Sequence, residues 1–171
     1  MRRLVCLVAI VTVLGIGCTH GDATAQQQSL KEQLLGTWIL VAWDQLRPDG
    51  SRFQKYGTDP RGFHIFERNG RFFAMMARPD LPKIGASDPQ KATPEEARAI
   101  MAGSIAYYGT YSVNEAERMV VLRMDASTFP NQLGRELPRR IVSVTANEMV
   151  YANPDATTGG GQIQLSWKRA Q

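Results

Sequence analysis

Short runs of apolar residues, separated by turn-forming residues, follow one another from Leu34 to the end of the chain. Several runs alternate apolar and polar positions, which is typical of strands that bury one face. Pro48-Asp49-Gly50, Asn69-Gly70 and Gly159-Gly160-Gly161 supply turn signals between them. The pattern predicts eight strands, at 36–45, 61–68, 71–78, 104–113, 118–127, 139–145, 147–152 and 162–169.

The order of these strands indicates a closed sheet. Most connections between them are short, so consecutive strands should pair as an antiparallel meander. Asn69-Gly70 is the strongest hairpin signal, because both residues accept a positive φ. Eight strands are the number expected for a small barrel. We therefore predict an all-β fold, an eight-stranded antiparallel up-and-down barrel.

One segment interrupts the strand pattern. Residues 79–92 are rich in proline, and the Thr-Pro-Glu-Glu sequence that starts at Thr93 has the form of a capping box. Pro94 suits the first helical position, and Gly103 can end the helix. We predict one short helix inserted between strands 3 and 4, where it covers one end of the barrel.

The amino end has the layout of a secretory signal peptide. Arg2 and Arg3 precede an uncharged apolar stretch at 4–17, and small residues lead to Ala25. The apolar stretch is shorter than the roughly 20 residues that span a bilayer. We predict a signal peptide at 1–25, a spacer at 26–33 and the barrel domain at 34–171.

A second interpretation of the amino end stays open. Ile16-Gly17-Cys18 resembles the end of a bacterial lipobox, with Cys18 as the lipidated first residue, although Gly15 stands where such a motif usually has Leu. Both interpretations predict an exported protein. The first predicts a periplasmic or extracellular protein, and the second a lipoprotein attached to the envelope at Cys18.

Composition argues against several kinds of chemistry. Cys6, Cys18 and His20 all lie near the amino end, so the predicted mature chain keeps no reactive thiol and only His64 as a histidine. This leaves too few residues for a zinc site, and no nucleophile elbow, phosphate loop, dinucleotide fingerprint or calcium loop is present. We expect no metal and no cofactor. For His64, a structural strand position and a general acid–base role both stay open.

Charge says little about partners. The chain has 20 Lys and Arg, 16 Asp and Glu and a formal net charge of +4. The basic residues are spread along the sequence, and Arg139-Arg140 is the densest pair. This favours solvated faces over nucleic-acid binding. We expect no nucleic-acid partner, membrane contact only through the leader or a lipid on Cys18, and an undetermined oligomeric state.

Two signatures carry a resemblance to known proteins. Gly36-Thr37-Trp38 matches the Gly-x-Trp pattern of the lipocalin superfamily, and Arg169 stands where that superfamily often has a basic residue that packs across the Trp. The chain also resembles the bacterial lipocalin-like domain family. The stretches that carry this resemblance are LLGTWILVAW (34–43), YGTDPRGFHIF (56–66), MARPDLP (76–82), ATPEEAR (92–98), IAYYGTYSV (105–113), STFPNQLG (127–134) and Arg139-Arg140.

The resemblance implies a calycin-type barrel whose interior can hold a small, mostly apolar ligand. It also implies structural roles for Gly36, Trp38 and Arg169. Where many members have a pair of histidines, this chain has Leu122-Arg123, so no role of those imidazoles carries over.

The alternation of side chains along each strand predicts which residues face the interior of the barrel. If Trp38 faces inward, so do Leu40 and Ala42. Tyr107 and Tyr111 share the apolar face of their strand, and their hydroxyls need a buried partner or a ligand. Alternation cannot orient the strand at 71–78, because both of its faces are apolar.

Arginine at the barrel mouth adds a second kind of candidate. Arg78 and Arg139 could bind a ligand carboxylate or phosphate, although Arg78 could equally form a salt bridge with Asp80. Our candidate ligand-binding residues are Trp43, Met75, Arg78, Tyr107, Tyr111 and Arg139.

These residues support three hypotheses. The first is an exported lipocalin-like barrel that binds a small apolar or amphipathic molecule. The second is a barrel-enclosed cyclase or isomerase that uses Tyr and Arg without a nucleophile. The third is a filled barrel that acts as an envelope lipoprotein through a protein partner. An internal cavity, and the polar side chains that line it, would discriminate among them.

Overall fold

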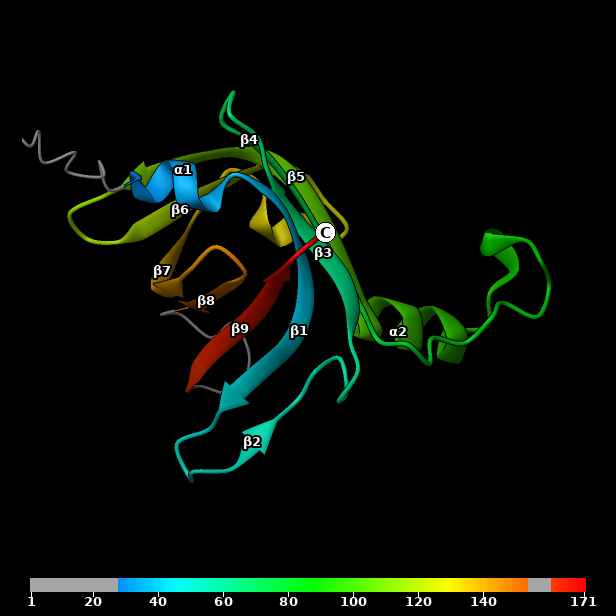
Figure 1. Ribbon diagram of the computed structural model, residues 1–171. Helices are drawn as coiled ribbons and strands as arrows, with labels where there is room; N and C mark the ends of the chain where they lie inside the picture. Colours follow the sequence, from blue (N-terminus) through cyan, green and yellow to red (C-terminus); the bar gives the residue numbers. More distant parts are fainter. Residues whose placement is uncertain (1–27, 154–160) are drawn as a thin grey trace, which may run out of the picture.

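The computed structural model describes residues 28–153 and 161–171. The predicted signal peptide and Cys18 lie outside these residues. The described chain forms a ring of antiparallel strands with short helices at its ends (Figure 1).

Eight strands form the ring, and each pairs with the next along it. Pairing between the first and last members closes the sheet, which confirms the predicted all-β, eight-stranded antiparallel barrel. The eight strands are β1 (Gly36–Leu46), β3 (Arg61–Phe66), β4 (Arg71–Ala77), β5 (Ser104–Asn114), β6 (Met119–Ser127), β7 (Glu136–Val144), β8 (Glu148–Asn153) and β9 (Gln162–Arg169).

The structure contains one short strand outside the ring. This strand comes before the predicted helix, so it changes the numbers of the strands on either side of that helix. Strand β2 (Arg52–Phe53) pairs with the end of β1, as Gln45 opposite Phe53 and Leu46 opposite Arg52. A two-residue strand has no alternation by which the sequence could reveal it. The helix expected between strands 3 and 4 is α2 (Pro94–Gly103), and it lies between β4 and β5, so its predicted position is wrong in the strand order of the structure.

Helix α2 begins at a complete capping box. Thr93 Oγ1 accepts a hydrogen bond from the Glu96 amide at 3.2 Å, and the Thr93 amide donates to Glu96 Oε2 at 2.8 Å. The same carboxylate also accepts from the Gly85 amide at 3.0 Å, which ties the preceding loop to the helix. Two 3₁₀ turns, η1 (Pro89–Lys91) and η2 (Pro130–Gln132), complete the helical elements of the described chain.

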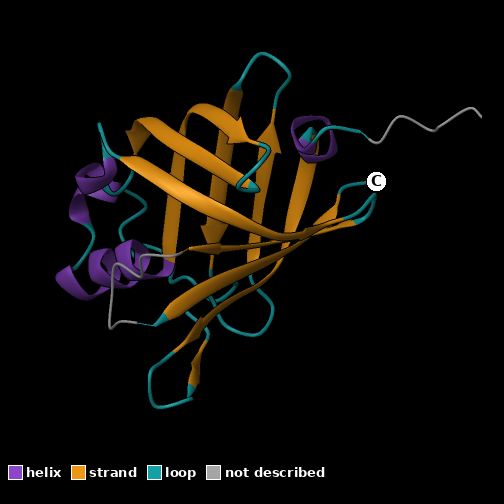
Figure 2. Cartoon of the chain, turned by 90° about the vertical axis from the view of Figure 1, so that its left-hand side faces the viewer, coloured by secondary structure: helices purple, strands orange, loops and turns teal. Residues whose placement is uncertain are grey.

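The two ends of the barrel differ. We call the end where β1 begins and β9 stops the closed end, because α1 (Leu30–Leu34) lies there. We call the other end, where β4 stops and β5 begins, the open end. Figure 2 shows α1 and the carboxyl terminus on one side of the barrel, and the remaining helices on the other.

Arg169 holds the closed end together. Its guanidinium donates to the carbonyl oxygens of Leu35 at 2.7 Å, Gln33 at 2.9 Å and Ala146, and lies 4.1 Å above the Trp38 ring. Gly36 leaves room for this contact, because it has a φ of 109° and an added Cβ would lie 3.1 Å from Arg169 Nη1.

A β-bulge in β1 corrects the predicted interior. The register shifts between Leu40 and Ala42. A bulge adds one residue to a strand and so changes which side chains face inward. Beyond it, Trp43 and Gln45 are buried, whereas Ala42, which simple alternation had placed inside, is only half-buried.

No helix in the described ranges is long and apolar enough to cross a membrane.

Candidate functional site

The open end of the barrel contains a cavity of about 280 Å³. Its wall is formed by side chains from the ring strands, the loop after β2, helix α2 and η2. The lining residues are Trp43, Lys55, Tyr56, Met76, Met101, Ser104, Ile105, Tyr107, Thr128, Phe129, Gln132, Arg139, Tyr151, Asn153, Ile163 and Leu165. A cavity of this volume suits a small organic molecule.

Much of the wall is apolar or aromatic. Met76, Ile163 and Leu165 are buried and contribute from β4 and β9. Trp43 meets Tyr56 edge to face, with ring centroids 5.9 Å apart. Such a wall binds apolar surface by excluding water and leaves orientation to a few polar groups.

Arg139 is a buried cation in this wall. Alternation along β7 turns Leu137, Arg139 and Ile141 inward, and Arg139 is only 7% exposed. Its Nη1 donates to the Pro138 carbonyl oxygen at 2.9 Å. A guanidinium has more N–H donors than this one bond uses, so the group can bind further acceptors.

Two buried phenols accompany Arg139. Burial raises the pKa of Tyr107, and the charge and hydrogen bonding of Arg139 oppose that rise. Burial also raises the pKa of Tyr151 well above its ordinary value, again against the effect of Arg139. Both hydroxyls therefore stay protonated at neutral pH. They are hydrogen-bonding groups and weak acids, which gives little support to a role as proton donors in catalysis.

His64 lies below this group, in the packed core. It is fully buried and stacks on Phe66 with ring centroids 4.1 Å apart. Burial, with a smaller effect of the Arg139 charge, lowers its pKa to about 3. His64 does not line the cavity, and a neutral imidazole among aromatic rings fits the structural role left open by the sequence.

The charged side chains described in the cavity wall are all positive. Among its described lining residues, Arg139 and Lys55 are cations and none is Asp or Glu. The ion pairs between described residues involve neither of these two cations. Lys55 is partly exposed, lies 5.1 Å from the Tyr56 ring centre, and has its pKa lowered by burial.

The structure brings together three of the six predicted ligand-binding residues. Trp43, Tyr107 and Arg139 line the cavity. Tyr107 faces inward as strand alternation predicts, whereas Trp43 does so because of the β1 bulge.

The other three lie elsewhere. Met75 is 40% exposed on the outer face of β4, because Phe72, Ala74 and Met76 take the inward positions. Arg78 is exposed and pairs with Asp80 at 2.7 Å. Tyr111 is buried toward the closed end, where its hydroxyl donates to the Glu67 carbonyl oxygen at 2.8 Å. None of these three residues lines the cavity.

Sequence reasoning also missed residues that the cavity contains. Tyr151 shares the inward face of β8 with Met149, and alternation along that strand could have found it. Tyr56 lies in the loop between β2 and β3, where no periodic pattern exists. Asn153, at the end of β8, directs a buried Oδ1 that has no hydrogen-bond partner among the described residues.

Two comparisons with known proteins found matches to this chain. A solved structure of a redesigned β-barrel is similar, with a TM-score of 0.44 and 10% sequence identity over 85% of this chain and 98% of that one. No curated protein matches the chain. The model of the lipocalin-like domain family matches residues 35–170, which is most of the chain. With its barrel, its Gly-x-Trp strand and the arginine across that Trp, the protein belongs to the lipocalin-like domain family.

Proposed function

We propose that this protein binds a small amphipathic molecule in the cavity at the open end of its barrel. Lipocalin-like proteins generally bind small hydrophobic ligands. The observation that carries the proposal for this chain is the cavity itself, about 280 Å³ in volume, with apolar walls and a few buried polar groups.

The barrel interior is packed at one end and hollow at the other. This arrangement supports a ligand-binding function over that of a filled barrel. Toward the closed end, Trp38, Leu122, Met149 and Trp167 are each at most 1% exposed and form a continuous core. The cavity lies beyond this core, at the open end. The packed half maintains the barrel, so the open half can remain unfilled without loss of the fold.

The size of the cavity restricts the ligand. The cavity volume of about 280 Å³ lies at the small end of the range for ligand pockets, roughly 300–1,000 Å³. A long acyl chain would extend past the mouth. We therefore expect a compact ligand with an aromatic or short aliphatic body and one polar end.

Native mass spectrometry after mild purification tests the proposal directly, because a co-purifying molecule adds its mass to the protein. Phenylpropanol is a suitable uncharged probe. Its addition should shift the NMR signals of residues such as Trp43 and Ile163 in a saturable manner, while signals from the closed end stay unchanged.

A pair of neighbouring methionines supplies matched variants. Met76→Trp fills the cavity and should weaken phenylpropanol binding at least about tenfold, whereas Met75→Trp adds the same bulk on the outer face and should leave binding unchanged. Thermal unfolding checks that both variants fold. If the unmodified protein has no co-purifying molecule and binds no probe, the proposal fails.

We further propose that the protein is exported. The proposal rests on the two arginines, the apolar stretch and the small residues before Gln26. Expression with the native leader should yield a protein that starts at Gln26, or one that carries a lipid on Cys18. An intact amino terminus in the cytoplasmic fraction would contradict export.

A further inference from the structure

We infer that the ligand of this barrel carries a carboxylate, and that the carboxylate binds Arg139. The inference rests on the proposed function, because it assigns the chemical class of the molecule in the same cavity. It begins from the position of one charged side chain.

A buried guanidinium requires a partner. Arg139 is 7% exposed, and its one backbone partner is the neutral carbonyl oxygen of Pro138. Removing a charge from water is costly unless an opposite charge or several hydrogen bonds replace the lost hydration. The described residues that line the cavity include no Asp or Glu. A ligand anion would therefore supply the missing negative charge.

Two tyrosines and a lysine near Arg139 also favour the binding of an anion. The hydroxyls of Tyr107 and Tyr151 lie in the same cavity wall as Arg139, which opposes the rise that burial causes in the pKa of each phenol. Burial keeps both phenols protonated, so neither carries a negative charge that would repel an anion. Lys55 adds a second positive charge in the more exposed part of the wall, where it can attract anions to the cavity.

The geometry favours a carboxylate among the anions. Arg139 is the one buried cation of the described cavity wall. A carboxylate monoanion balances its charge, and its two oxygens match the planar fork of a guanidinium. A phosphate dianion at Arg139 would keep one of its two charges unbalanced in the buried part of the cavity, because Lys55 lies in the more exposed part of the wall.

Two isosteric probes test the inference on the unmodified protein. Phenylpropionate and phenylpropionamide have the same body and nearly the same head, and differ in charge. Calorimetric or NMR titration should show the carboxylate binding at least about tenfold tighter than the amide, which is the effect expected of charge-assisted hydrogen bonds. Phenyl phosphate should bind more weakly than phenylpropionate.

Neighbouring arginines provide the matched variants. Arg139→Met should reduce the preference for the carboxylate over the amide to about onefold, and Arg140→Met, on the exposed face of β7, should preserve it. If Arg139→Met does not fold, Arg139→Lys replaces it, because lysine keeps the charge and lacks the fork. The preference should then fall below that of the unmodified protein.

The outcomes separate the inference from the proposed function. If the amide or phenylpropanol binds as well as the carboxylate, the ligand is neutral and the inference is overturned, while the binding function stands. If Arg139→Met keeps the preference for the carboxylate over the amide, the anion does not bind Arg139 and the inference is overturned. The same holds if only Lys55→Gln loses that preference. If none of the probes binds and no molecule co-purifies, the proposed function fails together with the inference.

Discussion

The hydroxyl of Tyr151 lies 3.4 Å from Nδ1 of His64, at the boundary between the packed core and the cavity. Because His64 is neutral, its Nδ1 can accept a hydrogen bond from this hydroxyl. This contact links the packed core to a phenol that lines the cavity, although His64 itself does not line it.

Stability should depend on pH through His64. Its pKa is about 3 in the folded state and 6.5 ordinarily, because burial disfavours the charged imidazole. Between these values the unfolded chain binds a proton that the folded chain does not. The free energy of unfolding should therefore fall as the pH drops below 6.5, by about 1.4 kcal/mol per pH unit from this group.

Urea unfolding at a series of pH values measures this dependence. His64→Gln keeps a neutral polar side chain and should flatten the curve between pH 6 and 4, even though it lowers stability at every pH. An equal slope in the variant would assign the acid sensitivity to other groups.

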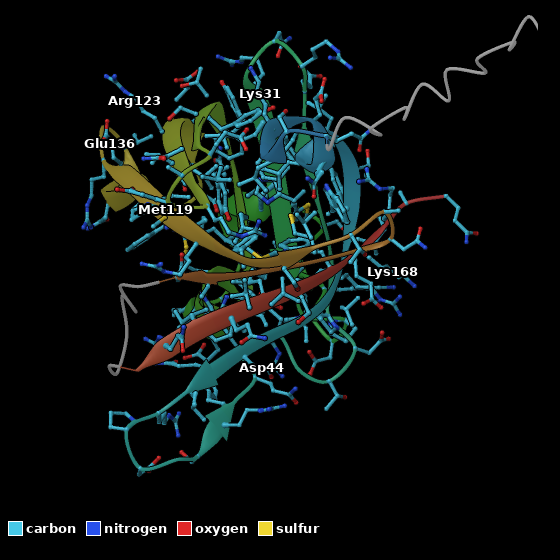
Figure 3. The ribbon with its side chains drawn as sticks, turned by 60° about the vertical axis from the view of Figure 1, so that its left-hand side comes forward. Lys31, Asp44, Met119, Arg123, Glu136 and Lys168 are labelled. Carbon is cyan, nitrogen blue, oxygen red and sulfur yellow. The ribbon has the colours of Figure 1, made fainter. Side chains whose placement is uncertain are left out.

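Arg169→Ala should destabilise the protein by about 2–3 kcal/mol, because the variant loses charge-assisted hydrogen bonds to the Leu35 and Gln33 carbonyl oxygens and the contact with Trp38. The neighbouring Lys168 points outward (Figure 3), and Lys168→Ala should change stability by less than about 0.5 kcal/mol. Chemical denaturation of both variants provides the comparison. Similar losses in the two would show that the closed end does not depend on Arg169.

The two tyrosines predicted from one strand face should behave differently. Tyr111→Phe removes a hydrogen bond to the Glu67 carbonyl oxygen, which costs about 1 kcal/mol of stability, and should leave ligand affinity unchanged. Tyr107→Phe removes a hydroxyl from the cavity and should weaken phenylpropionate binding severalfold. Affinity and stability measured on both variants check this separation. A loss of affinity in Tyr111→Phe would mean that ligand binding extends toward the closed end.

Gly109→Ala should destabilise the barrel by at least about 2 kcal/mol. Gly109 lies at the bulge between β5 and β6, and an added Cβ would overlap the carbonyl oxygen of Arg123. That oxygen is part of the backbone and cannot move aside alone. Thr110→Ala, at the next and exposed position, is the control and should have a small effect in thermal unfolding. Equal effects would show that β6 can move away from β5.

The barrel could be predicted from the sequence because its signals are local. Alternation along β5, β6 and β9 correctly placed Tyr107, Leu122 and Leu165 inside. The Asn69-Gly70 turn fixed the hairpin of β3 and β4, where Gly70 has a φ of 83°. The capping box located the start of α2. Each of these features depends on residues close together in the chain.

The site was predicted less completely because it depends on non-local features. Met75 and Met76 are chemically identical, and only the pairing of β4 with its neighbours decides which faces inward. The β1 bulge turned Trp43 inward against simple alternation. That Arg139 has no acidic neighbour in the cavity wall, and that His64 is enclosed by aromatic rings, became visible only once the ring had closed.

Helix α1 and the last residues of β9 lie at the closed end, at the opposite end of the barrel from the cavity. The described residues begin at residue 28 and end at Gln171 on the same side of the barrel (Figure 2), whereas the cavity lies at the open end. A tether joined at the carboxyl terminus would therefore leave the cavity mouth facing away from the attachment point. Immobilising the protein through its carboxyl terminus on a sensor surface should give the same ligand affinity as free solution.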